Sequence, residues 1–107
     1  MTKFELYKDS NGFYRFKLIA GNGKTILTSG ANETKCNCKI DIQAVINSCQ
    51  NKANYEVFES KNSNIFFNLR ASNKKIVGKS RLYSSKRGLE YGISYIKKNA
   101  LRAEVIE

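Results

Sequence analysis

Apolar and polar residues alternate with a period of two near the start of the chain, which is the pattern of strands with one buried face. The alternation covers Lys3–Lys8 and Phe13–Ala20, and a third short segment covers Lys24–Ser29. Turns of the Asn-Gly and Gly-Asn-Gly type separate the three segments, as expected for hairpin connections. The pattern therefore predicts a three-stranded antiparallel meander. The inward face of its second strand would hold Tyr14, Phe16, Leu18 and Ala20.

From about Thr34 the period becomes helical. Apolar residues recur at the spacing of one helix face, namely Cys38, Ile42, Val45, Ile46 and Cys49. Thr34, or Asn32 just before it, is suited to cap the first turn. The sequence therefore predicts an amphipathic helix that packs on the meander.

The whole pattern returns 51 positions later, because Asn22–Ser29 corresponds to Asn73–Ser80. A repeat at a fixed offset indicates two copies of one structural unit. The second copy has a strand at Tyr55–Phe58 and another at Ile76–Tyr83, and Ser84 or Ser85 can cap its helix. Its second strand would point inward through Ile65, Phe67, Leu69 and Ala71, and its helix through Leu89, Ile93, Ile96 and Ala100. Ala103–Ile106 is predicted to form a closing strand.

Each copy is too small to be comfortably stable alone, because a unit of this size buries only about 60% of its unfolded surface. We therefore expect the repeats 1–51 and 52–107 to share one core in a single body, residues 1–107. The predicted fold class is α+β: two tandem β-β-β-α-β units related by a pseudo-twofold axis, with antiparallel sheets each covered by a helix.

Two glycines, Gly88 and Gly92, fall inside the second predicted helix. Glycine in a helix interior costs about 1 kcal/mol relative to alanine. We therefore predict that another stretch of backbone approaches the helix closely at these positions.

The composition is that of a globular protein with a strong positive charge. The net charge is +10, divided as +3 in residues 1–51 and +7 in residues 52–107. Such a charge favours an anionic partner such as nucleic acid or a membrane surface. An excess of lysine over arginine, with 12 asparagines, can equally reflect genome composition. Since no apolar run is long enough for a membrane span, we expect a soluble cytoplasmic protein without membrane contact.

The clearest functional signal is a basic run without an acidic residue in the second repeat. Its candidate nucleic-acid-binding residues are Lys74, Lys75, Lys79, Arg81, Tyr83, Lys86 and Arg87. On a strand, Lys75, Lys79, Arg81 and Tyr83 would point the same way. The cations and the start of a helix could hold phosphates, and Tyr83 could stack on a base. The alternative is a solvated face whose lysines keep a sheet edge from aggregating.

Metal binding and catalysis have weaker support. Cys36, Cys38 and Cys49 could supply three thiolates, but histidine is absent, and Cys38 and Cys49 share the apolar stripe of the first predicted helix. An odd number of cysteines favours reduced thiols over disulfides. Without histidine the commonest general base is missing. We predict no catalytic residues and no metal, although a catalytic role for Lys86 or Glu90 stays open.

The spacing of these motifs resembles the YegP-like proteins, a bacterial family of unknown function. The resemblance rests on Phe4–Asp9, Gly12–Phe16, Asn22–Gly23 and Ile26–Ser29 in the first copy and on Tyr83–Lys86, Gly88–Ile93 and Lys97–Ala100 in the second. It implies units of three strands, a helix and a closing strand that is exchanged between units. It implies no catalytic residues and no cofactor.

The two copies depart from this pattern in different places. Where the second copy has Tyr83, Gly88 and Gly92, the first has Asn32, Asn37 and Asp41; the turn residues Asp9 and Gly12 are replaced by Ser60 and Ser63. Any site built on the helix motif is therefore predicted only in the second copy. We expect a non-enzymatic monomer with an internal pseudo-dimer. It would be either a weak, sequence-independent nucleic-acid-binding module through the second repeat or a protein-interaction or structural module.

Overall fold

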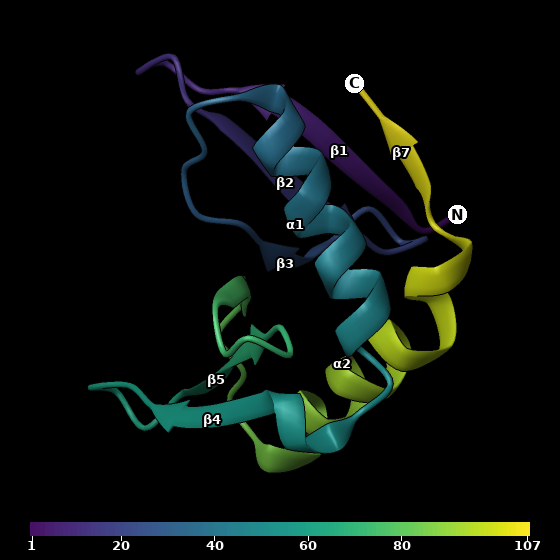
Figure 1. Cartoon of the computed structure of the whole chain (residues 1–107). Helices are drawn as coiled ribbons and strands as arrows, with labels where there is room; N and C mark the ends of the chain where they lie inside the picture. The colour runs from purple at the N-terminus through teal and green to yellow at the C-terminus, as the bar shows by residue number, and fades with distance from the viewer.

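The computed structural model describes all residues from 1 to 107 and contains seven strands, two α-helices and two short 3₁₀ helices (Figure 1). We use first repeat for residues 1–51 and second repeat for residues 52–107. The first repeat contains β1 (Lys3–Lys8), β2 (Tyr14–Ile19), β3 (Thr25–Thr28) and α1 (Lys35–Ser48). The second contains η1 (Lys52–Asn54), β4 (Tyr55–Glu59), β5 (Ile65–Arg70), β6 (Ile76–Ser80), α2 (Lys86–Asn99), η2 (Ala100–Arg102) and β7 (Glu104–Ile106). The predicted α+β fold of tandem units is confirmed.

All seven strands form one mixed sheet in the order β4-β5-β6-β3-β2-β1-β7. The two expected meanders are joined edge to edge, because β3 pairs with β6 in antiparallel fashion. At this junction Thr28 lies directly opposite Lys79, its own counterpart at the offset of 51. The pseudo-twofold axis therefore passes between these two residues.

Beside the axis, a large residue of one repeat packs on a small residue of the other. A Cβ atom placed on Gly78 would lie 2.7 Å from the side chain of Leu27, which is fully buried. Leu27 thus fills the space that any side chain at residue 78 would need.

Both repeats carry a bulge at the same place, between Leu18 and Ile19 and between Leu69 and Arg70. In the second repeat, Leu69 is opposite Gly78 whereas Arg70 is opposite Ile76, so β6 has one extra residue at Val77. A bulge of this kind shifts the alternation of side chains between the two faces. The bulge therefore affects on which face of the sheet Lys75 and Lys79 lie.

The core lies between the sheet and the two helices, and the predicted stripes supply it. Phe16, Leu18, Phe67 and Leu69 of the sheet are fully buried. The helices bury Cys38, Ile42, Val45, Cys49, Leu89, Ile93, Ile96 and Ala100.

Both predicted helix caps are confirmed. Thr34 accepts the N–H of Asn37 at 3.0 Å, and Ser85 accepts that of Gly88 at 3.1 Å. These side chains stabilise the first turn, where backbone N–H groups have no helical partner.

The third strand of each repeat is shorter than predicted, and a serine explains the difference. In the second repeat β6 ends at Ser80, whose hydroxyl oxygen accepts the N–H of Phe67 at 2.9 Å. Ser29 does the same for Phe16 in the first repeat. Because the side chain replaces a backbone acceptor, the regular ladder stops there. Tyr83 returns to the sheet only as an isolated bridge with Ile65.

The closing strand β7 crosses to the first repeat and pairs parallel with β1. The first repeat has no equivalent strand, because the chain passes through η1 directly into β4. Exchange therefore occurs in one direction. Neither helix has the length and apolarity that a bilayer crossing requires.

Candidate functional site

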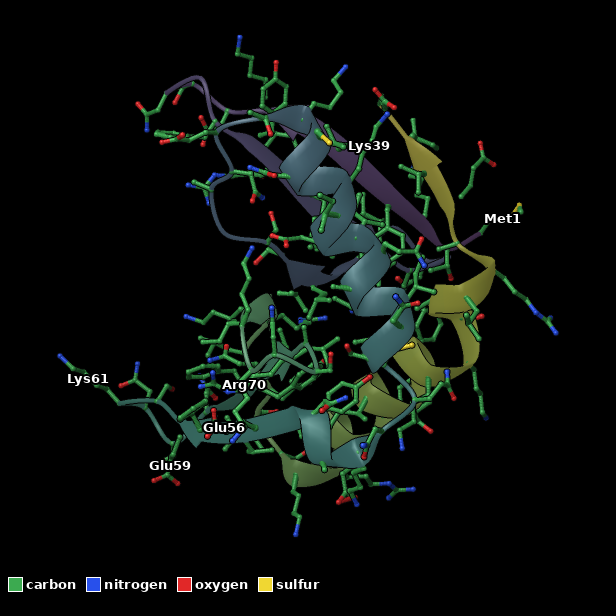
Figure 2. All side chains as sticks on the ribbon, in the orientation of Figure 1. Met1, Lys39, Glu56, Glu59, Lys61 and Arg70 are labelled. Atoms are coloured by element: carbon green, nitrogen blue, oxygen red, sulfur yellow. The ribbon has the colours of Figure 1, made fainter.

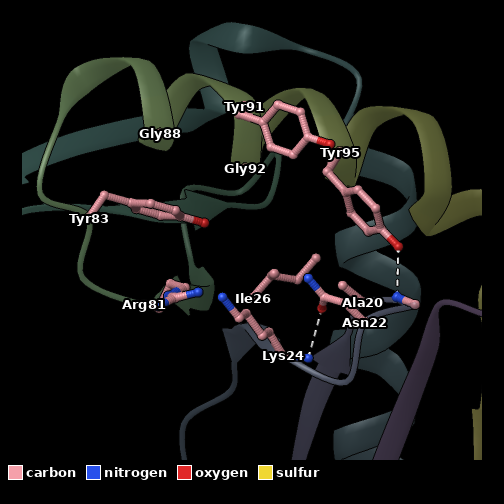
Figure 3. Close-up of a pocket in the computed structure, with 11 residues that line it drawn as sticks. Ala20, Asn22, Lys24, Ile26, Arg81, Tyr83, Gly88, Tyr91, Gly92 and Tyr95 are labelled. Carbon is pink, nitrogen blue, oxygen red and sulfur yellow. Dashed lines mark hydrogen bonds between the residues drawn. The ribbon is translucent and has the colours of Figure 1, made fainter.

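A pocket of about 420 Å³ lies between α2 and the β2–β3 turn, and we call it the tyrosine pocket (Figure 3). Three tyrosines line it together with side chains of both repeats. Its main residues are Asn22, Lys24, Arg81, Tyr83, Tyr91 and Tyr95, with Gly88 and Gly92 at the helix surface. The pocket therefore exists only in the joined molecule.

The two helix glycines make room for the ring of Tyr83. A Cβ atom on Gly92 would overlap the Tyr83 hydroxyl, and one on Gly88 would lie 3.5 Å from the ring. The predicted close approach of backbone is therefore wrong. An aromatic side chain, anchored by its backbone bridge to Ile65, occupies that space instead.

Tyr95 holds the floor of the pocket in place. Its hydroxyl oxygen accepts the N–H of Gly21 at 3.0 Å (Figure 3). The same hydroxyl is hydrogen-bonded to that of Thr2. The side chain of Asn22 accepts the N–H of Lys24 at 2.9 Å, which closes the turn. These bonds tie the first repeat to α2 and leave the cationic end of Lys24 free to face the pocket.

The pocket has cations and no carboxylate among its lining residues. The guanidinium carbon of Arg81 lies 5.8 Å from the centre of the Tyr83 ring, a cation–π contact that orients it beside the pocket. Burial raises the pKa of Tyr83, and the nearby charge of Arg81 opposes that shift only in part. The Tyr83 hydroxyl is therefore neutral near pH 7 and can donate or accept a hydrogen bond.

The structure does not bring the predicted basic run together. Lys75 reaches the helix side of the sheet and pairs with Asp41 of α1 at 2.9 Å. Lys79 lies on the opposite face, 4.7 Å from the centre of the Phe66 ring. The bulge at Val77 causes this separation, because it reverses the alternation between the two lysines.

The other members of the run have separate surroundings. Lys74 is exposed in the β5–β6 turn with a φ of 70°, and Lys86 and Arg87 are exposed in the first turn of α2. Only Arg81 and Tyr83 line the tyrosine pocket.

Sequence reasoning missed Tyr91 and Tyr95. The ring of Tyr83 already contacts Arg81, whereas Tyr91 is 74% exposed and offers an unoccupied ring. A signal was present: the two tyrosines are spaced by four residues and lie outside the apolar stripe of α2.

The cysteines are arranged as separate thiols. Cys38 and Cys49 are fully buried, and burial raises the pKa of both. Cys36 is exposed. No group of three or more cysteine, aspartate or glutamate side chains is placed to hold a metal ion.

The corresponding place in the first repeat is closed. Asp41, at the position of Gly92, is buried and holds Lys75, at the position of Lys24. Asn32, at the position of Tyr83, is also buried, and its side-chain nitrogen has no hydrogen-bond partner.

Comparison with known proteins agrees with this architecture. The domain of unknown function DUF1508 matches residues 9–56 and again 60–107. The UPF0339 protein YegP of Shigella flexneri is 38% identical over 96 residues, which cover 90% of this chain and 87% of that protein.

Two solution NMR structures share the fold. The protein of unknown function yegP from E. coli has a TM-score of 0.92 at 36% identity, over 98% of this chain and 90% of that one. A UPF0339 protein from Shewanella oneidensis has a TM-score of 0.92 at 34% identity, over 98% and 89%. None of these descriptions names an enzymatic activity. With both repeats matched and the fold shared over nearly its whole length, the chain belongs to the UPF0339 family of tandem DUF1508-domain proteins.

Proposed function

We propose that this protein is a non-enzymatic binding module whose tyrosine pocket holds a unit of single-stranded nucleic acid, weakly and with little sequence preference. The observation that carries the proposal is the lining of the pocket: two cations, Lys24 and Arg81, beside an exposed ring, Tyr91, with no carboxylate. Phosphates are attracted to lysine and arginine, and every base can stack on an aromatic ring.

The site is pre-organised for this role. Arg81 is oriented by its contact with Tyr83, and the turn that carries Lys24 is fixed by Tyr95. Lys86 and Arg87 are exposed within two residues of Gly88 and supply further cations for neighbouring phosphates. Lys75 does not contribute, because Asp41 neutralises it.

The test is fluorescence anisotropy with labelled single-stranded oligonucleotides of two unrelated sequences. For two to four phosphate contacts, the logarithm of the association constant should fall with the logarithm of salt concentration at a slope of about −1.4 to −2.8. Arg81→Glu combined with Lys24→Glu should abolish binding. Lys61→Glu with Lys98→Glu, which makes the same charge change at exposed positions outside the pocket, is the matched control.

The ring is tested separately from the charges. Tyr91→Ala should weaken binding by the value of one stacked base, about 1–3 kcal/mol, whereas Tyr91→Phe should retain it. Equal losses in the pocket variants and the charge control would show that net charge alone attracts the oligonucleotide and would refute the pocket.

A further inference from the structure

The first strands of the two repeats, β1 and β4, have different neighbours in the sheet. The outer edge of β1 is covered by β7, which pairs with it in parallel through Lys3, Phe4 and Glu5. The strand at the matching place in the second repeat is β4, which ends the sheet with no strand beside it. β4 therefore presents one row of unpaired backbone groups to solvent.

This open edge follows from the way the repeats are joined. Residues 103–106 of the second repeat, which contain β7, correspond to residues 52–55 of the first. Those residues form η1 and the start of β4. Residues 52–55 thus lead directly into β4 along the chain and cannot pair with β4 as a separate strand.

The side chains of β4 are also more exposed than those of β1. Val57 of β4 is 52% exposed, whereas its counterpart in β1, Leu6, is 4% exposed. Phe58 is exposed as well, and it stacks on Phe66 of the neighbouring strand at 5.4 Å between ring centres. Each face of the sheet thus has one exposed apolar side chain of β4 at the uncovered edge. Glu56 is paired with Arg70 beside it, and Glu59 and Lys61 extend into solvent at its end (Figure 2).

The covered edge shows which kind of segment fits. Glu104–Ile106 is an extended piece with two apolar residues, and the following Glu107 is held by Lys35 and Lys39 of α1 at 3.0 and 2.9 Å. At the matching positions α2 carries Lys86 and Glu90, so one of the two cations is kept. The net charge of +10 opposes a second copy of this chain and favours an acidic partner.

We propose that the β4 edge is a strand-addition site for an extended segment of another protein, in which acidic residues flank an apolar pair. The segment pairs parallel with β4 as β7 pairs with β1. Backbone hydrogen bonds supply the affinity. In the register of β7 on β1, the apolar pair lies opposite Tyr55 and Glu56, and Val57 and Phe58 are the next side chains on the same two faces. Lys86 attracts the carboxylate that follows the pair. This site is separate from the tyrosine pocket, and its occupation requires no nucleic acid.

The test uses a synthetic peptide with the sequence of residues 100–107, which contains the internal example of such a segment. Titrated into the isotope-labelled full-length protein, it should shift the amide NMR signals of β4 and slow hydrogen exchange there. A dissociation constant of about 1 mM or tighter is expected, as for a weak peptide motif. A peptide with lysine in place of both glutamates should bind at least tenfold more weakly.

Two lysine variants test whether the peptide binds at the β4 edge or at another surface of the protein. Val57→Lys places a charge on the apolar edge of β4 and should abolish the shifts. Ile40→Lys makes the same change at an exposed position of α1 and should leave binding unchanged. Shifts in β1 instead of β4, or none at saturating peptide, would overturn the proposal. So would a dimer of the protein alone that Val57→Lys dissociates, because a second copy would then occupy the edge.

Discussion

The two repeats carry the same frame around two different sites. In the second repeat, Gly92 leaves room for the ring of Tyr83, and Lys24 of the adjoining turn forms no ion pair. At the counterpart in the first repeat, Asp41 fills the place of the glycine and captures Lys75. The lysine of the turn thus faces an open pocket where the helix carries glycine and a buried carboxylate where it carries aspartate.

The closed site should be the more sensitive to the loss of its cation. Lys75→Met leaves the buried Asp41 carboxylate, whose side chain is 8% exposed, without its partner. We expect the free energy of unfolding to fall by about 1–3 kcal/mol, the cost of an unsatisfied buried polar group. Urea unfolding measures this. The double change Lys75→Met with Asp41→Ala should recover part of the loss.

An exposed pair provides the control for that experiment. Glu56→Gln removes the partner of Arg70, where both side chains are at least one-third exposed, and should cost at most about 1 kcal/mol. If the cost of Lys75→Met is no larger, the ion pair with Asp41 does not hold the first site closed.

At the open site, alanine substitution of Gly92 and of Gly88 should have opposite effects on stability. Gly92→Ala forces the end of Tyr83 to move, at a cost of about 1–3 kcal/mol for overpacking, against about 1 kcal/mol gained in helix propensity. Gly88→Ala meets the ring at ordinary contact distance and should stabilise the protein by up to about 1 kcal/mol.

Thermal unfolding and the anisotropy assay together check this pair of variants. Gly92→Ala should lower both the melting temperature and the affinity for the oligonucleotide. Gly88→Ala should raise the melting temperature. Identical behaviour of the two would mean that Tyr83 does not depend on the space over Gly92.

The smallest expected effect is on stability at alkaline pH. Tyr83 contributes to it, whereas its counterpart at the closed site, Asn32, does not. Burial raises the pKa of Tyr83 above its ordinary value of about 10. The unfolded chain therefore ionises first, so the stability associated with Tyr83 is complete below pH 10 and is lost as pH rises through the folded-state pKa. Between pH values of about 8 and 10.5, the wild type should lose more unfolding free energy than Tyr83→Phe. Equal losses would assign the alkaline effect to other groups, such as Tyr55, whose pKa burial also raises.

The elements of this fold were predictable because their signals are local. Alternation predicted the buried faces of β2 and β5, helical spacing predicted the stripes of α1 and α2, and Thr34 and Ser85 stood at the caps. The offset of 51 residues extended each inference to the other repeat.

What the sequence did not show depends on contacts between distant segments. The extra residue at Val77 places Lys75 and Lys79 on opposite faces of the sheet. Counting alternate positions along the strand predicts the same face for both. The pocket is formed by α2 and a turn of the other repeat, so neither segment alone predicts it. The sequence did indicate that a site at the helix motif would belong to the second repeat. The tyrosine pocket uses that helix motif together with the β2–β3 turn of the first repeat.

The packing of Leu27 over Gly78 also bears on how the two repeats fit together. These residues are counterparts beside the pseudo-twofold axis, where a position lies close to its own copy. In a homodimer of single repeats such a residue must fit itself. Two leucines here would collide, and two glycines would leave a hollow. In a single chain the two counterparts can differ, so the repeats are complementary at this contact and cannot be exchanged for one another.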